Sequence, residues 1–277
     1  MFFFFFWPEI NNINLIFFIL LKKGECFSMK MMVTTRKHSY LINDEDLSLV
    51  ELGSVVFVPE EEKFYIVLSP GTLTEISAEE ASAIVGTVEE FADALAAGGT
   101  VKVAENINAP TGLIITTDST VINDKEITIS EDTEGNGVFM VTAGTLTLEG
   151  KGTINGVGKN DWNMALWAKE NGKIVINDGY FTNEGATANV DPEHFDLIYA
   201  SGNAQIEING GEFKCQTPAW TLNIKDKDRA TASIVVKGGK FHGFDPSNCA
   251  SEGPNTNFVA PGYKVVEENG VFTVMPE

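Results

Sequence analysis

Three copies of one short pattern decide the fold: Lys173-Ile-Val-Ile-Asn-Asp-Gly-Tyr-Phe181, Gln205-Ile-Glu-Ile-Asn-Gly-Gly-Glu-Phe213 and Ser233-Ile-Val-Val-Lys-Gly-Gly-Lys-Phe241. In each copy one position separates two apolar residues, a glycine follows three residues after the second, and a phenylalanine comes two residues later. The copies follow one another after 32 and 28 residues. A period of this size, built from alternating β-branched residues, indicates strands that stack copy on copy rather than helices.

The glycine and the phenylalanine of each copy predict two columns of equivalent residues. The glycine lies where the backbone needs a positive φ to turn a corner, and the phenylalanine then faces inward from the next strand. Stacked copies place equivalent residues about 4.8 Å apart. We therefore expect one column of Gly179, Gly211 and Gly239 and a second of Phe181, Phe213 and Phe241.

A further apolar strand precedes each copy, at residues 165–168, 197–199 and 222–224, and an earlier one at 138–141 stands in the same relation to 146–154. Three short strands per repeat are the arrangement of a parallel β-helix. The sequence therefore predicts an all-β fold, a right-handed parallel β-helix with an N-terminal capping helix and a small N-terminal β module.

The segments around the repeats predict how the chain is divided. Thr87 and Glu90 form a capping box for a helix that ends at Gly98-Gly99 and covers the first strands, and a shorter helix is expected over 77–84. The predicted parts are a small β module with a hairpin at 29–76, a helical cap at 77–99, the β-helix at 100–244, and a loop with a closing hairpin at 245–277.

Residues 1–28 do not read as a folded segment. Their positive charges, Lys22 and Lys23, follow the apolar run instead of preceding it, and the run 15–21 is too short to span a bilayer. Lys22-Lys-Gly-Glu can back-translate to a ribosome-binding sequence before Met29. Our hypothesis is that residues 1–28 are an untranslated leader and that translation starts at Met29, Met31 or Met32. The alternative is a hydrophobic anchor.

Composition excludes some classes of function. The net charge is −20, and Arg36 and Arg229 are the two arginines, so the surface repels phosphate backbones and nucleic-acid binding is rejected. We interpret the acidity as a solvated face that keeps an exposed fold soluble, with cation binding as the alternative. Three cysteines, Cys26, Cys215 and Cys249, form neither a disulfide framework nor a metal-ligand pattern with the histidines.

Two loops, 155–164 and 182–196, together with Trp220 carry the residues that could do chemistry. Sugar-cleaving enzymes use paired carboxylates, or carboxylates that bind calcium beside a basic residue. The catalytic candidates are Asp161, Asp191, Glu193 and Asp196, and the residues that could stack on a sugar ring are Trp162 and Trp220. Solvated loop charges and tryptophan packing are the structural alternatives. We expect no cofactor, with calcium as the ion such loops could bind.

Asn177 and Asn209 hold equivalent positions in two copies of the repeat. Stacked asparagines form hydrogen-bonded ladders, so a structural ladder is expected at these positions rather than a binding site.

Two stretches carry a resemblance to known proteins. Residues 87–103 resemble the capping helix and first strand of pectate-lyase-like β-helix proteins, and 244–266 resemble the C-terminal segment of structural or fibre-like proteins of gut Bacteroides phages and prophages. Polygalacturonase-type motifs such as Gly-His-Gly and Arg-Ile-Lys are absent.

The resemblance implies a non-enzymatic virion structural protein, a head fibre or tail appendage, located in the virion. A homotrimer, other virion proteins and a surface polysaccharide are the implied partners, with no nucleic acid and no membrane span. The alternatives are a tailspike-like polysaccharide lyase or hydrolase, and a bacterial secreted or cell-surface adhesin.

Overall fold

A computed structural model of the chain describes residues 32–34, 39–41, 55–58, 63–69, 72–77, 83–130, 136–158, 163–185, 195–253 and 256–277. The chain divides into two compact units, residues 1–84 and 85–277. The hypothetical leader lies outside the described residues, and the predicted domain boundaries stay predictions.

The described residues of the first unit form an antiparallel sheet. Its strand order is β2 (Ser39–Leu41), β1 (Met32–Thr34), β3 (Val55–Val58), β4 (Lys63–Ser69) and β5 (Thr72–Ile76). The predicted hairpin is confirmed, because β3 and β4 pair antiparallel from Val55 opposite Ile66 to Val58 opposite Lys63. Val56 on β3 and Val67 on β4 are fully buried.

The second unit begins with helix α2 (Val88–Ala97), and the predicted capping box is present. The Thr87 hydroxyl accepts a hydrogen bond from the Glu90 amide at 3.2 Å, and the Glu90 carboxylate accepts one from the Thr87 amide at 3.2 Å. Phe91 is fully buried and meets Phe139 edge to face, with ring centroids 5.9 Å apart. The short helix expected over 77–84 lies largely outside the described residues, and Ile84 itself belongs to strand β6 (Ile84–Val85).

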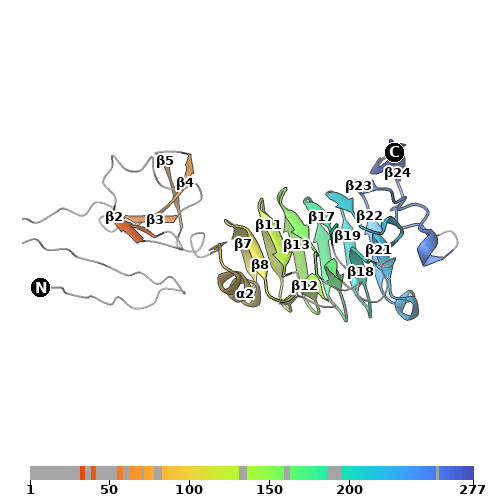
Figure 1. Cartoon of the computed structure of the whole chain (residues 1–277), viewed down its shortest axis with the longest axis horizontal. Helices are drawn as coiled ribbons and strands as arrows, with labels where there is room; N and C mark the ends of the chain where they lie inside the picture. Colours follow the sequence, from red (N-terminus) through yellow and green to blue (C-terminus); the bar gives the residue numbers. More distant parts are fainter. Residues whose placement is uncertain are drawn as a thin grey trace, which may run out of the picture. The chain divides into compact units, whose positions relative to one another are not determined.

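Three sheets follow α2, and the chain takes one strand in each sheet in turn before returning to the first (Figure 1). One pass through the three sheets is called a circuit below. The seven-stranded sheet contains β6, β7 (Gly99–Val103), β10 (Ser119–Asn123), β13 (Thr145–Glu149), β16 (Lys173–Ile176), β19 (Gln205–Ile208) and β22 (Ser233–Val236).

The other two sheets take their strands from the same successive circuits. The eight-stranded sheet contains β8 (Ile107–Ala109), β11 (Glu126–Ile129), β14 (Thr153–Asn155), β17 (Tyr180–Thr182), β20 (Glu212–Lys214), β23 (Gly239–His242), β25 (Val271–Pro276) and β24 (Tyr263–Glu268). The five-stranded parallel sheet contains β9 (Leu113–Ile115), β12 (Gly137–Val141), β15 (Met164–Ala168), β18 (Ile198–Ala200) and β21 (Leu222–Ile224). Three short 3-10 helices lie among the described residues, η2 (Pro218–Trp220), η3 (Asp226–Asp228) and η4 (Ala250–Glu252).

The two predicted columns are confirmed. The rings of Phe181 and Phe213 stack with centroids 5.0 Å apart, those of Phe213 and Phe241 stack at 4.7 Å, and all three side chains are fully buried. The glycines of the second column have φ values of 126°, 96° and 106° at Gly179, Gly211 and Gly239.

The prediction of a right-handed parallel β-helix, a single closed solenoid, is wrong. The strands of the second unit form separate sheets of the α/β type, parallel except where β25 pairs with β23 and β24, together with a single α-helix among the described residues. The hydrogen-bonded ladders run between circuits within a sheet, as from Ile176 to Ile208, and not across the corners between sheets. The repeats predict which strands pair. How the sheets are arranged around one another depends instead on the connections from the eight-stranded sheet to the five-stranded parallel sheet, which differ in length and sequence.

Each sheet ends in a different way at the C-terminal side. The hairpin of β24 and β25 extends the eight-stranded sheet and turns at Asn269-Gly270, as predicted. The segment around Val259 makes a parallel bridge to Val236 of the seven-stranded sheet. At the last strand of the five-stranded parallel sheet, the Glu252 carboxylate accepts a hydrogen bond from the Ile224 amide at 2.7 Å.

Candidate functional site

The predicted catalytic and stacking residues fall on two loops that join the eight-stranded sheet to the five-stranded parallel sheet and on the segment before β21. Asp161, Trp162, Asp191 and Glu193 lie outside the described residues, so their roles stay predictions. Asp196 and Trp220 are described, and both are half-buried.

Asp196 is part of a packed network at the start of β18. Its carboxylate accepts a hydrogen bond from the Asn223 side chain at 2.6 Å, and its backbone carbonyl accepts one from the Asn183 side chain at 3.0 Å. Burial, and then the Asp196 charge, raise the pKa of the Tyr199 hydroxyl. The Trp220 carbonyl accepts a hydrogen bond from the Leu197 amide at 3.1 Å. These contacts fit the structural alternative, in which Asp196 and Trp220 hold the segment that enters the sheet.

Cys215 lies beside this network and is buried. Its thiol donates a hydrogen bond to the Phe195 carbonyl at 2.9 Å, and burial raises its pKa to about 12. Since the thiolate is the nucleophile, this position gives a thiol that does not react near neutral pH.

We expect iodoacetamide to alkylate Cys215 about a thousandfold more slowly in the folded protein than in denaturant at pH 8, because the raised pKa leaves about one thiol in ten thousand ionised. The measurement is the rate of labelling of the Cys215 peptide by mass spectrometry. Similar rates in the folded and unfolded protein would contradict this environment. As the thiolate is favoured only after unfolding, alkaline pH above about 8.5 should also lower stability.

The asparagine ladder is confirmed at the corner that directly follows the strands of the seven-stranded sheet. The Asn209 side chain donates a hydrogen bond to the Asn177 side-chain oxygen at 3.0 Å, and Asn177 donates to the Glu149 carboxylate at 3.5 Å. Beside it, the Lys237 ammonium lies 3.0 Å from the Glu207 carboxylate. These polar groups are therefore satisfied by one another.

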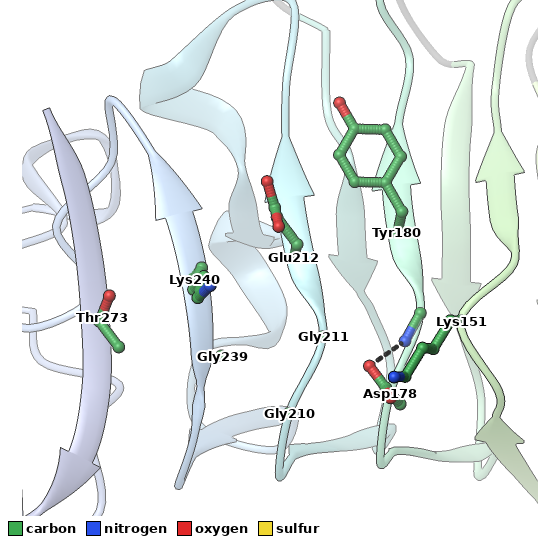
Figure 2. Close-up of a pocket in the computed structure, with 10 residues that line it drawn as sticks. Lys151, Asp178, Tyr180, Gly210, Gly211, Glu212, Gly239, Lys240 and Thr273 are labelled. Atoms are coloured by element: carbon green, nitrogen blue, oxygen red, sulfur yellow. Dashed lines mark hydrogen bonds between the residues drawn. The ribbon is translucent and has the colours of Figure 1, made fainter.

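A groove crosses the outer face of the eight-stranded sheet (Figure 2). It is open to solvent, has a volume of about 570 Å³, and is lined by Lys151, Asp178, Gly179, Tyr180, Gly210, Gly211, Glu212, Gly239, Lys240 and Thr273. The residues of this groove are not among the site residues predicted from the sequence.

One wall of the groove is a row of side chains from successive strands. Tyr180 on β17 is in register with Glu212 on β20, Glu212 with Lys240 on β23, and Lys240 with Thr273 on β25. Neighbouring members of the row are about 4.8 Å apart along the sheet. An aromatic ring, a carboxylate, an ammonium group and a hydroxyl thus follow one another on one side.

The floor of the groove is backbone at the glycine corners. A Cβ atom at Gly210 would lie 2.3 Å from the Asn177 carbonyl oxygen, so a side chain is excluded from this position. The previous circuit has Asp178 there, and its carboxylate accepts a hydrogen bond from the Gly179 amide at 2.9 Å. The floor is therefore flat beside Glu212 and Lys240.

The charges in the row are partly engaged. The Glu212 carboxylate lies 2.7 Å from Nε2 of His242, and both side chains are partly exposed. Burial, and then the nearby Glu184 carboxylate, raise the pKa of the Tyr180 hydroxyl, which keeps the hydroxyl protonated as a hydrogen-bond donor. A flat surface of this kind can stack a sugar ring on Tyr180 and bind its hydroxyl groups with Glu212 and Lys240.

The sequence held a signal for this groove. Tyr180, Glu212 and Lys240 each stand between the glycine and the phenylalanine of the repeat, so stacked copies must place them side by side. The fourth wall residue, Thr273, comes from the antiparallel hairpin and breaks the repeat.

No family model, curated protein or solved structure matches this chain. Among the described residues, no group of histidine, cysteine and carboxylate side chains is arranged to hold a metal ion. No helix in the described part of the chain is long and apolar enough to cross a membrane.

Proposed function

We propose that the protein is a non-enzymatic structural component of a phage virion, a head fibre or tail appendage, that adheres to a surface glycan through the groove on the eight-stranded sheet. The row of Tyr180, Glu212 and Lys240 carries the adhesion part of this proposal, since it combines a stacking ring with a hydrogen-bond acceptor and a donor. The virion location rests on the resemblance of residues 244–266. The homotrimer is a further prediction from that resemblance.

The contacts of Asp196 argue against a catalytic role for this residue. A catalytic carboxylate must reach the scissile bond, whereas the Asp196 carboxylate is bound to Asn223 and lies against the buried Tyr199.

Replacing Tyr180 by alanine is expected to weaken binding to the recognised polysaccharide about tenfold, because the stacking surface is lost. Tyr180→Phe keeps the ring and should bind within about threefold of the unchanged protein. Affinities are measured by calorimetry or biolayer interferometry after a screen of bacterial surface and plant polysaccharides. Thr100→Ala, on an exposed position of the seven-stranded sheet, is the control that should change nothing.

Two results would overturn the proposal. Release of oligosaccharides from a bound polysaccharide would make the protein an enzyme. Absence of the protein from purified phage particles, judged by mass spectrometry, would remove the virion role and leave a bacterial adhesin.

A further inference from the structure

The outermost strand of the eight-stranded sheet, β24, has an open edge. Within the described residues it pairs with β25 alone. Val266 of β24 is 43% exposed and stands opposite Thr273, which lines the groove, so Val266 lies on the outer face of the sheet. Lys264 and Glu268 share that face with Val266, because side chains alternate along a strand.

The backbone groups on the open edge can be identified from the hairpin. Its two loop residues, Asn269 and Gly270, have φ values of 53° and 78°, as in a type I′ turn, so the flanking residues Glu268 and Val271 form a hydrogen-bonded pair. Hydrogen-bonded pairs alternate along an antiparallel ladder. The backbone groups of Val265 and Glu267 therefore point away from β25.

Tyr263 has the same orientation, but its amide already donates to the Ala260 carbonyl at 3.2 Å. Val265 and Glu267 consequently offer two amides and two carbonyls at the open edge. An antiparallel strand that forms hydrogen bonds with all four groups must point the amides and carbonyls of two residues toward this edge, and those two residues must be two positions apart.

We propose that this edge binds the same edge of a second copy of the chain, antiparallel, with a two-fold axis at Val266. A two-fold contact joins copies in pairs, so it is distinct from the three-fold contacts of the predicted homotrimer and links two single chains or two such trimers. In this register Val265 stands opposite Glu267 of the partner subunit, and Glu267 opposite Val265 of the partner subunit, so both residues form backbone hydrogen bonds in both copies. Val266 meets Val266 of the partner subunit on the outer face, in a pair without backbone hydrogen bonds, where side chains are closest.

The charges select this register. Lys264 stands opposite Glu268 of the partner subunit, and the symmetry repeats that pair on the other side of the axis. Charged residues on edge strands usually prevent pairing, but in this register no like charges face each other. A register centred on Val265 would need the Tyr263 amide, which is occupied, and would place Lys264 opposite Val266 of the partner subunit.

The contact between the two β24 edges does not depend on the proposed glycan binding. It does affect how strongly a polymeric glycan would bind. The two-fold axis is perpendicular to the sheet, so the outer faces of both copies lie on the same side. Two grooves would face one surface, and a polymeric ligand could bind both with gain in avidity.

Charge reversal tests the contact in the full chain. Lys264→Glu and Glu268→Lys each place like charges opposite one another twice, and each should raise the dimer dissociation constant at least about tenfold. The double variant Lys264→Glu with Glu268→Lys restores opposite charges and should return the constant to within about threefold of the original. The measurement is sedimentation velocity or light scattering over a concentration series.

Val266→Asp is a second disruptive change at an exposed position, since it sets two carboxylates against each other at the axis. Lys102→Glu, the same charge change on an exposed position of the seven-stranded sheet, should leave association unchanged. The proposal would be overturned if the protein is monomeric at every concentration. It would also be overturned if the protein forms a dimer or trimer whose dissociation constant is the same in the β24 variants. Failure of the double variant to restore association would do the same. Glycan binding by such a monomer would leave the proposed function intact.

Discussion

The Phe213→Ala variant is expected to lose about 3–5 kcal/mol of unfolding free energy. Phe213 is fully buried, and its ring stacks on Phe181 at 5.0 Å and on Phe241 at 4.7 Å. Truncation leaves a cavity between two rings that are held by backbone ladders on both sides. The lining cannot collapse without breaking strand register, so the cost should lie at the upper end of the usual range.

Urea denaturation of the full chain, followed by tryptophan fluorescence, measures this loss. Ile114→Ala is the control, because Ile114 is 61% exposed on the outer face of the five-stranded parallel sheet and should change stability by less than about 0.5 kcal/mol. A loss below about 1 kcal/mol at Phe213 would show that the rings are not packed as described.

The Glu252→Ala variant is expected to lose about 2–3 kcal/mol, because the change leaves the buried Ile224 amide without its acceptor. The Glu252 side chain is 2% exposed, and its second oxygen lies 3.2 Å from the Arg229 guanidinium. Glu252→Gln keeps an acceptor for the amide and should lose less. Equal losses in the two variants would contradict the role of the Ile224 hydrogen bond.

The unchanged protein and the Glu252→Gln variant should differ in how their free energy of unfolding depends on pH. Burial raises the pKa of Glu252, although the Ile224 amide and Arg229 favour its charged form. A raised folded pKa means that the carboxyl's contribution to stability is complete below its unfolded pKa of about 4.3 and is lost as pH rises through the folded pKa. Relative to Glu252→Gln, the unchanged protein should therefore lose stability from about pH 4 upward, as measured by urea denaturation at a series of pH values.

Local features of the fold were predictable because the chain repeats itself. Equivalent residues recur at the same offset, so Phe181, Phe213 and Phe241 had to stack once the strands paired in parallel. The capping box at Thr87 was predictable from four residues alone. The arrangement of the sheets was not predictable in this way, because it depends on the corners that lead from the eight-stranded sheet into the five-stranded parallel sheet, and these corners differ in length.

The candidate site was predicted less well for a related reason. Carboxylates and tryptophans in loops drew attention to Asp196 and Trp220, which take part in packing contacts. The groove instead consists of ordinary strand residues, and each one alone has no special signal. Only their shared position in the repeat shows that Tyr180, Glu212 and Lys240 form one surface.

The stacked phenylalanines have an evolutionary consequence. If a segment of about one circuit were duplicated, the new phenylalanine would stack between two existing phenylalanine rings. Helix α2 at one end and the β24–β25 hairpin at the other would stay unchanged. Recombination within the gene could therefore lengthen or shorten the protein without the invention of any new interface. Related chains that differ by whole circuits are the natural variation to expect from such a sequence.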